Sequence, residues 1–385
     1  MWTPSIVSAL ENAETPLYFY DMVLLKKTLA EIIQTSKVYD FHVHYALKAN
    51  NNTKVLQIIQ EAGLGADCVS GNEIELAVEH GFKTNQIVFA GVGKTVKEIL
   101  TALKHQIFCF NVESVQELEV IAQLCLENET TARIALRINP NVDAHTHHYI
   151  TTGLDENKFG ILTHELPLCL EIIEKNSQLQ LCGLHFHIGS QITDLNVFKS
   201  LCVKVNEWNR WFINRGHEVK VLNVGGGLGI DYDQPDAVGI PDFAVFFAIF
   251  NQFLERKPDQ QIHFELGRSI VGQCGSLISR VLYIKNGLKK NFAILDAGMT
   301  ELLRPSLYQA YHKIETVKRH LQSESEMIYD VVGPICESSD CFGKEVRLAE
   351  LNRGDLIAIR SAGAYGEVMA LRYNLRAPLN FVYLE

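Results

Sequence analysis

The sequence lacks the features that mark membrane, secreted and nucleic-acid-binding proteins. Its strongest apolar run, FAVFFAIF at 243–250, is far too short to span a bilayer, and we expect it to form a buried helix. The N-terminal segment has neither a basic start nor an apolar core, so it does not predict a signal peptide. Lysine and arginine form no run with interleaved aromatic residues, and the formal net charge is −10. We therefore expect a cytoplasmic protein that binds neither membranes nor nucleic acid.

Paired cysteines are also absent. The nine cysteines are spread singly along the chain, and no CxxC pair occurs. An odd count at irregular spacing is typical of reduced thiols rather than of a disulfide framework or a zinc site. The cysteines therefore agree with a reducing compartment.

What is present is an alternation of two kinds of segment. Of the 385 residues, 47% are hydrophobic and 21% charged, as in ordinary globular proteins of one or two domains. From about residue 22 to 268, short apolar runs alternate with amphipathic segments such as SVQELEVIAQLCLEN at 114–128. This predicts parallel βα units, most simply a (β/α)8 TIM barrel, with a doubly wound open sheet as the competing interpretation. The eight runs are His42–Leu47, Gly65–Val69, Ile87–Ala90, Ile107–Phe110, Arg133–Ile138, Cys182–His187, Val221–Val224 and Ile262–Glu265.

The pattern changes after residue 270. Segments such as GSLISRVLYIKN and GDLIAIRSAGAY are rich in β-formers, with turns between them and little helix. TPLYFYD at 15–21 is a strand of the same kind that stands before the barrel. We therefore predict a barrel domain at 22–268, and a β-barrel or β-sandwich domain that combines 1–21 with 269–385.

Polar residues and glycines follow several of the predicted barrel strands. Lys48 follows the first run, His187 ends the sixth and Glu265 ends the eighth. GGGLG at 225–229 exposes backbone N–H groups with no Cβ in the way, and Arg268 adds a fixed cation. Barrel enzymes carry their chemistry at the carboxyl ends of the strands, with a phosphate site commonly after strands seven and eight. The sequence therefore predicts a phosphate-bearing ligand at this end of the barrel.

A metal site is the alternative that the first barrel strand raises. His42 and His44 alternate as in barrel metallohydrolases, whose first strand carries two metal-binding histidines. Those enzymes also need a histidine near the end of the fifth strand and an aspartate at the eighth. Here the fifth strand reads RIALRINP and the eighth ends in Glu265, so we predict no metal.

A strand-end lysine, a phosphate loop and an inward carboxylate together indicate pyridoxal phosphate: the lysine for the aldehyde, the carboxylate for the ring nitrogen and the loop for the phosphate. At these residues the sequence resembles the diaminopimelate decarboxylases, which are barrel-type pyridoxal-phosphate decarboxylases with the alanine racemase-like fold. The resemblance covers nearly the whole chain. Its matching segments are YALKAN, GADCVSGNE, NVDAHTHHYITTGLDENKFGI, GLHFHIGSQ, NVGGGLGIDY, ELGR, LRPSLYQAYH, CESSD and GAYG.

The resemblance implies which residues bind the cofactor. Lys48 would hold its aldehyde covalently, His187 would stack on its ring, and Glu265 would hydrogen-bond its ring nitrogen. Racemases of this fold place an arginine at the ring nitrogen, so Glu265 favours decarboxylation. The positions implied around the phosphate and the rest of the cofactor are Ser190, Gly227, Gly267, Arg268 and Tyr365.

The resemblance also implies a substrate, meso-2,6-diaminopimelate, which the enzyme would convert to L-lysine and CO2 in the last step of lysine biosynthesis. Cys336 would donate the proton, and Glu337 would bind the distal amino group. In this family both reach the site from the other subunit, so a homodimer with shared active sites is implied. The implied substrate-binding positions are Arg268, Arg304, Tyr308, Glu337 and Tyr365.

Two alternative functions remain open on sequence alone. A decarboxylase of the same fold could act on carboxynorspermidine or another basic amino acid, although Arg304 suits a substrate with a distal carboxylate. The chain could also be a non-catalytic regulator that binds the cofactor, although such a protein need not keep Lys48, Cys336 and Glu337. The sequence departs from the family pattern at Leu266, where proline is usual, and at Ser339, where glycine is common. It also has GVGKT at 91–95 in place of an Asn-rich loop, and none of these changes removes a reacting group.

Overall fold

The computed structural model describes residues 2–140, 158–317 and 326–385. The chain folds into two compact units. The first, here called the β unit, comprises Met1–Thr28, Ile230–Pro241 and Arg268–Glu385. The second, the barrel unit, comprises Leu29–Gly229 and Asp242–Gly267.

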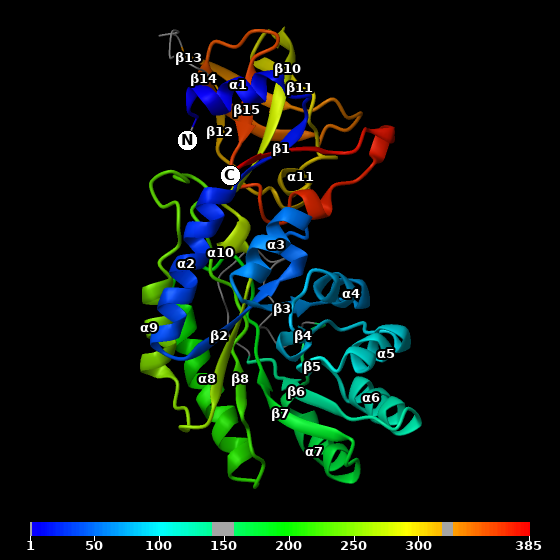
Figure 1. Cartoon of the computed structure of the whole chain (residues 1–385). Coiled ribbons are helices and arrows are strands. Elements are labelled where there is room, and N and C mark those ends of the chain that lie inside the picture. Colours follow the sequence, from blue (N-terminus) through cyan, green and yellow to red (C-terminus); the bar gives the residue numbers. More distant parts are fainter. Residues whose placement is uncertain (1, 141–157, 318–325) are drawn as a thin grey trace. The chain divides into compact units, whose positions relative to one another are not determined.

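The barrel unit is a closed ring of eight parallel strands, which excludes the open sheet (Figure 1). Closure comes from the pairing of the first and last strands, in which His44 lies opposite Glu265. Each predicted run forms a strand, with boundaries that differ by a few residues. In order around the ring the strands are β2 (Phe41–Ala46), β3 (Gly65–Cys68), β4 (Ile87–Phe89), β5 (Cys109–Val112), β6 (Ala132–Arg137), β7 (Leu179–His185), β8 (Val221–Asn223) and β9 (Gln261–Leu266).

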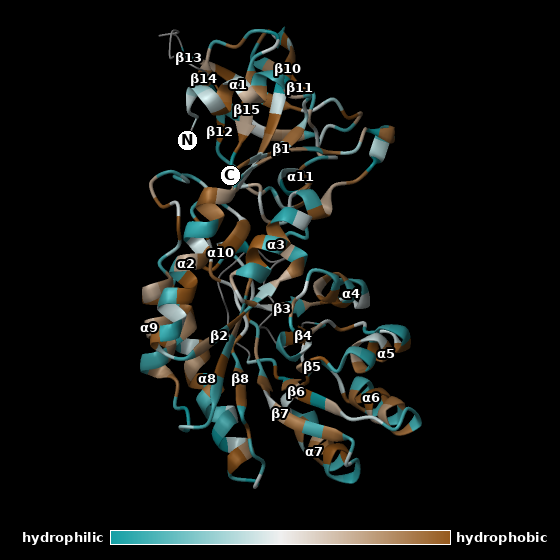
Figure 2. Cartoon of the chain, in the orientation of Figure 1, coloured by the Kyte–Doolittle hydropathy of each residue, from teal (hydrophilic) through white to brown (hydrophobic). Residues whose placement is uncertain are grey.

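Helices follow the strands, and Figure 1 shows α4 to α7 on the outer side of β3 to β7. Capping residues begin several of them: Ser70 and Ser114 accept N–H bonds from the first turn, and Thr95 forms a capping box with Glu98. In Figure 2 these helices carry hydrophobic and hydrophilic residues on different sides. The helices are α2 (Met22–Val38), α3 (Thr53–Glu61), α4 (Gly71–Glu79), α5 (Val96–His105), α6 (Val115–Glu127), α7 (Leu166–Lys175), α8 (Asn196–Ile213) and α9 (Phe243–Phe253).

The apolar run at 243–250 forms the buried helix that was predicted, within α9. Phe246, Phe247 and Phe250 pack edge-on against Phe264 of β9, with ring centres 5.6, 4.9 and 4.9 Å apart. The run is therefore accounted for by packing against the barrel. In the part of the chain that the structure describes, no helix is long and apolar enough to cross a membrane.

The β unit is built on one eight-stranded mixed sheet, as its β-rich sequence predicts. The N-terminal strand β1 (Leu17–Asp21) joins it, antiparallel to β10 and parallel to β16. The two short helices α10 (Arg268–Val271) and α11 (Arg304–Tyr308) follow β9 and β11 in the chain. The other strands are β10 (Gly275–Asn286), β11 (Asn291–Leu295), β12 (Ile314–Val317), β13 (Glu326–Val332), β14 (Cys341–Ala349), β15 (Leu356–Ile359) and β16 (Asn380–Leu384).

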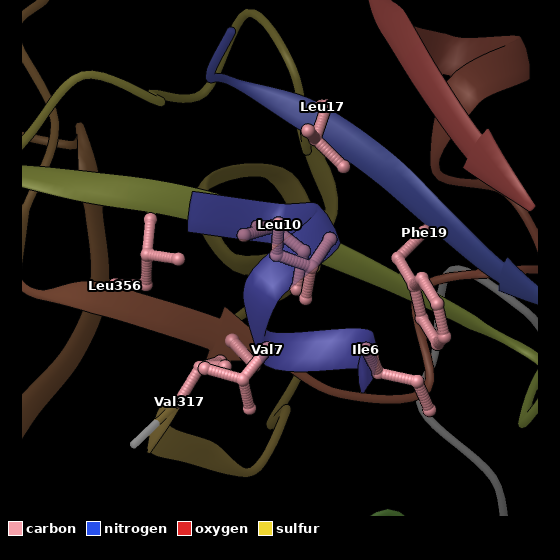
Figure 3. Packing of buried hydrophobic residues seen from close by; sticks show 9 residues of the cluster. Ile6, Val7, Leu10, Leu17, Phe19, Val317 and Leu356 are labelled. Atoms are coloured by element: carbon pink, nitrogen blue, oxygen red, sulfur yellow. The ribbon is translucent and has the colours of Figure 1, made fainter. Parts of the chain in front are cut away.

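One helix of the β unit was not expected. Helix α1 (Pro4–Asn12) begins at the N-cap Thr3, with proline in its first turn. Ile6, Val7 and Leu10 are buried on its inner face and pack with Leu17 and Phe19 of β1 (Figure 3). This cluster covers one face of the sheet and ties the first residues of the chain to the C-terminal third.

Candidate active site

A cavity of about 440 Å³ opens at the carboxyl ends of the barrel strands. It brings together three residues predicted from the sequence, Lys48, His187 and Glu265. The other lining residues come from the last positions of β6 and β7 and from the segments that follow β3, β4 and β6: Val69, Ala90, Gly91, Val92, Gly93, Arg137, Phe159 and His185. The cavity therefore lies where a barrel enzyme carries its chemistry.

Lys48 lies in a short 3-10 turn, Leu47–Ala49, directly after β2. Its Nζ is 3.1 Å from Oδ2 of Asp67 at the end of β3; the lysine side chain is 36% exposed and the aspartate is fully buried. Burial raises the pKa of Asp67 to about 7, the Glu265 carboxylate adds to the rise, and Lys48 opposes it. The lysine amine thus reaches the cavity beside a carboxyl group that can hold or release a proton near neutral pH.

Glu265 is a buried carboxylate that accepts hydrogen bonds from several side chains. Asn111 and Asn223 donate their Nδ2 groups to its Oε1 over 2.9 and 2.7 Å, and Nε2 of His185 lies 2.9 Å from its Oε2. Burial alone would raise the pKa of this carboxyl, but the charge and hydrogen bond of His185, and then the charge of Lys48, hold the pKa of Glu265 well below its usual range. Glu265 is therefore an anion at neutral pH.

His187 lies two residues beyond the end of β7. Burial lowers its pKa well below the usual value, and the charges of Arg137 and Lys48 act in the same direction. Its Nδ1 accepts a long bond, 3.4 Å, from the Gly226 N–H. The ring is therefore neutral and lies against the glycine loop.

The glycine loop after β8 fits closely between neighbouring backbone segments. Gly227 has φ +104°, and a Cβ there would come within 2.8 Å of the Gly189 carbonyl oxygen; a Cβ on Gly226 would overlap the Glu265 carbonyl oxygen. Ile192 holds the loop by accepting from Gly229 N and donating to Gly227 O, at 2.9 and 2.8 Å. Among the described residues, no acceptor takes the N–H groups of Gly227 and Leu228. The loop can therefore offer backbone donors to an anion.

Two more predicted positions lie on the segments that flank this loop. Ser190 belongs to the segment after β7, which pairs with the glycine loop through the isolated bridge between Ile192 and Leu228. Gly267 follows β9 and approaches the lysine turn, because a Cβ on it would lie 2.9 Å from the Ala49 Cβ. Both positions thus border segments that carry Lys48 or the glycine loop.

An ion pair beside the cavity was missed from the sequence. Arg137 at the end of β6 donates to Oε1 of Glu113 over 2.8 Å, and the Gly91 N–H donates to the same oxygen over 2.6 Å. Both side chains are buried, at 7% and 1% exposure. Asn111 and Glu113 lie in and just after β5, so a search of every strand end for polar residues would have found them.

The β unit contains a second cluster, built around two buried arginines, Arg268 and Arg304. Arg268 donates to the Tyr232 hydroxyl over 2.5 Å, and its guanidinium carbon is 4.9 Å from the Tyr365 ring centre. Arg304 lies 5.5 Å from the Tyr232 ring centre, and its Nε is 3.2 Å from Nε2 of His312. Burial lowers the pKa of His312 to about 3, so this ring is a neutral acceptor. Arg268, Arg304 and Tyr365 are therefore gathered around shared partners.

The remaining predicted residues lie on the surface of the β unit. Tyr308 ends α11 and is half-buried, whereas Cys336 and Glu337 are exposed in the turn between β13 and β14. The Tyr373 hydroxyl donates to Glu337 over 2.8 Å, and Ser306 of α11 donates to the Ser339 carbonyl over 2.6 Å. Within the described chain, no hydrogen bond or ion pair joins Cys336 or Glu337 to the two buried arginines.

A different cavity, of about 450 Å³, lies at the amino ends of the barrel strands. His42, His44 and His263 line it, and Nε2 of His44 is 2.8 Å from Nδ1 of His263. Burial lowers the pKa of His44 to about 4 and that of His263 well below its usual value. His263 and Glu265 thus share the inner face of β9 but line cavities at opposite ends of the barrel strands. In the ranges that the structure describes, no cluster of three metal-ligating side chains occurs.

Comparison with known proteins agrees with this arrangement. The family described as "Pyridoxal-dependent decarboxylase, pyridoxal binding domain" matches residues 25–272. A diaminopimelate decarboxylase of Bacteroides thetaiotaomicron is 55% identical over 371 residues, which are 96% of this chain and 95% of that protein. The crystal structure of diaminopimelate decarboxylase from Helicobacter pylori complexed with L-lysine has a TM-score of 0.92 at 41% identity, covering 98% of this chain and 93% of that one.

A more distant structure shares the fold alone. The arginine decarboxylase of Paramecium bursaria Chlorella virus has a TM-score of 0.85 at 21% identity, covering 99% of this chain and 98% of that chain. The architecture by itself therefore does not select a substrate. The identities over nearly the full length do select a family: the chain belongs to the diaminopimelate decarboxylases, a family of pyridoxal-dependent carboxy-lyases.

Proposed function

We propose that this protein converts meso-2,6-diaminopimelate to L-lysine and CO2, with pyridoxal 5'-phosphate bound in the barrel cavity. The observation that carries the proposal is the meeting of Lys48, His187 and Glu265 around one cavity at the carboxyl ends of the strands. The relatives named above, one of them bound to L-lysine, support the substrate.

The residues of the cavity fit the cofactor. An amine at the cavity wall, Lys48, suits an aldehyde; an anionic carboxylate, Glu265, suits a protonated ring nitrogen; and a neutral buried imidazole, His187, suits a flat ring face. The N–H groups of Gly227 and Leu228 suit a phosphate, because backbone N–H groups in a glycine-rich loop are anion donors. We assign Ser190, Gly267 and Arg268 to the surroundings of that phosphate, and Tyr365 to the cofactor as well.

Bound pyridoxal phosphate supplies an aldehyde for the substrate amine and a ring that accepts the electron pair left when CO2 departs. Lys48 would hold that aldehyde when no substrate is bound. Asp67, 3.1 Å from the Lys48 amine, balances its charge and takes or returns a proton near pH 7. Glu265, ionised at neutral pH, would accept a hydrogen bond from the ring nitrogen and so favour the protonated ring.

The β unit supplies substrate recognition and the final proton in this proposal. Arg304, buried and held by His312, provides a cation for the distal carboxylate, with Arg268, Tyr308 and Tyr365 as further contacts. Cys336 delivers the proton to the carbon that lost CO2, and Glu337 binds the distal ammonium. Their exposed turn fits the proposal that both enter the active site of a partner subunit, so that the enzyme works as a homodimer.

We propose residues 22–268 as the cofactor-binding domain, and 1–21 with 269–385 as the β domain. We also propose that the enzyme works in the cytoplasm. All nine cysteines are free thiols, as a reducing compartment would keep them. Sγ of Cys109 and Cys182 are 3.3 Å apart and share a hydrogen bond rather than a disulfide.

A substrate panel tests the proposal. The purified holoenzyme is incubated separately with meso-diaminopimelate, carboxynorspermidine, ornithine and arginine, and both CO2 and the amine product are measured. We expect lysine and CO2 in equal amounts from meso-diaminopimelate and at least a hundredfold lower kcat/KM for the others, because a buried Arg304 is left without its carboxylate. Preferred turnover of carboxynorspermidine would contradict the proposed substrate. Binding of the cofactor without turnover of any of the four compounds would favour the alternative that the protein is a non-catalytic regulator.

A further inference from the structure

We propose that Asn111, Asn223 and His185 are positioning residues that hold the Glu265 carboxylate in one orientation and leave a single acceptor site on it for a ring nitrogen. The three residues come from β5, β8 and β7 of the barrel, and all three are buried. The inference rests on the proposed cofactor but not on the proposed substrate.

The three donors occupy most of the acceptor positions of the Glu265 carboxylate. A carboxylate has about four acceptor positions, two on each oxygen. Asn111 and Asn223 both donate to Oε1, at 2.9 and 2.7 Å, and fill that oxygen. Nε2 of His185 lies 2.9 Å from Oε2, and within the described chain no other donor bonds to that atom. The remaining acceptor position of Glu265 is therefore on Oε2.

The orientation of His185 follows from its surroundings. Its Nδ1 is buried and has no hydrogen-bond partner among the described residues. Since Glu265 accepts at the other nitrogen, Nε2 carries a hydrogen and donates it. His185 thus fills one side of Oε2 and confines the remaining acceptor position to the other.

Asn223 also connects the carboxylate to the glycine loop. While its Nδ2 donates to Glu265, its Oδ1 accepts from the Gly225 N–H over 3.0 Å, at the start of the loop. One side chain therefore fixes both the proposed partner of the ring nitrogen and the proposed phosphate loop. The distance between the two is then set by a rigid planar amide rather than by a flexible side chain.

The amides suit this position because they add no charge to a crowded group of titratable side chains. Neutral donors stabilise the anionic form of Glu265 without adding a second charge that would compete with it for the cofactor. An aspartate in place of either asparagine would replace a donor by a like charge and raise the pKa of Glu265. The titratable or charged groups that face Glu265 are His44, Lys48, Asp67, Cys109, His185, His187 and His263.

The substitution Asn223→Asp tests the inference sharply. It keeps the oxygen that accepts from Gly225, so the loop contact is preserved, and it replaces the donor to Glu265 by a second carboxylate oxygen. Asn111→Asp is the second variant, should the first not fold. Asn206→Asp is the matched control, because Asn206 is also buried in the barrel unit, donating to Phe253 O and accepting from Glu255 N at 2.8 and 2.9 Å.

The readout is the ring nitrogen itself, followed by 15N NMR of the enzyme loaded with 15N-labelled pyridoxal phosphate, without substrate. We expect the nitrogen to lose its proton at a pH at least about one unit lower in Asn223→Asp and Asn111→Asp than in the wild type, and at an unchanged pH in Asn206→Asp. Affinity for pyridoxal phosphate should fall about tenfold relative to an analogue with carbon in place of the ring nitrogen.

Two results would overturn the inference: an unchanged nitrogen titration in both site variants, or an equal loss of affinity for the cofactor and for its carbon analogue. Either would mean that the asparagines only support the fold. Failure of the wild-type protein to bind pyridoxal phosphate would instead overturn the proposed cofactor. Binding without turnover of meso-diaminopimelate would overturn only the proposed substrate.

Discussion

The buried carboxylates Glu113 and Glu117 allow a sharp test of the electrostatics around the active site. They lie four residues apart, with side chains 1% and 9% exposed. Yet the pKa of Glu113 is lowered and that of Glu117 is raised. Burial raises both; the charges of Arg137 and Lys94 outweigh it at Glu113, whereas Lys94 does not outweigh it at Glu117. We predict that Glu113→Gln destabilises the protein more than Glu117→Gln.

The magnitudes follow from the partners that each substitution leaves behind. Glu113→Gln leaves Arg137 buried without its anion and turns an amide NH2 group towards donors such as the Gly91 N–H, so we expect a loss of about 3–5 kcal/mol. Glu117→Gln leaves Lys94 with two carbonyl acceptors, Gly91 O and Asn111 O, at 2.9 and 2.8 Å, so we expect about 1–3 kcal/mol.

The effect has a pH dependence of defined sign. Glu113 has a lowered pKa in the folded state, so its contribution is present above about pH 4.5 and is lost as the pH falls. Glu117 has a raised pKa, so its ionisation costs stability as the pH rises through that value. Urea unfolding of both variants at pH 7.5 and pH 4.5 measures this. Equal losses at pH 7.5, or a difference that grows towards acid, would refute the reasoning.

Two further predictions concern other parts of the barrel. His44→Gln should reduce the loss of folding stability that occurs as the pH falls from 6.5 to 4. Burial lowers the pKa of His44 to about 4, so the wild type loses on the order of 3 kcal/mol of stability over this range. Parallel plots of stability against pH for the wild type and the variant would contradict this. Gly226→Ala should weaken binding of pyridoxal phosphate at least about tenfold, because the new Cβ overlaps the Glu265 carbonyl oxygen. Gly239→Ala, whose Cβ would meet its nearest neighbours only at 3.9 Å, is the control, and an equal effect of both on cofactor affinity would refute the steric argument.

The barrel and three of the residues that line its cavity could be predicted from the sequence because both have local signals. Short apolar runs separated by amphipathic segments define the strands, and Lys48, His187 and Glu265 stand out as polar residues at strand ends. The start of α1 also has a local signal, Thr3 followed by Pro4, which is typical of a helix N-terminus. Local signals therefore identify elements and candidate groups.

The network around Glu265 has no such signal. Asn111, His185 and Asn223 lie 154, 80 and 42 residues from Glu265 along the chain, and they meet only because the barrel closes. An asparagine in a strand reads equally well as a turn residue or a buried amide. Only the strand register decides which of these residues share a layer inside the barrel.

The most direct test of the central claim is to locate the cofactor on the chain. The enzyme loaded with pyridoxal phosphate is reduced with borohydride, digested and analysed by peptide mass spectrometry. We predict the added mass on the peptide that contains Lys48, with loss of both this mass and the visible absorption of the cofactor in Lys48→Ala. Attachment to a different lysine, or an unchanged absorption in Lys48→Ala, would contradict the assignment of this cavity as the active site.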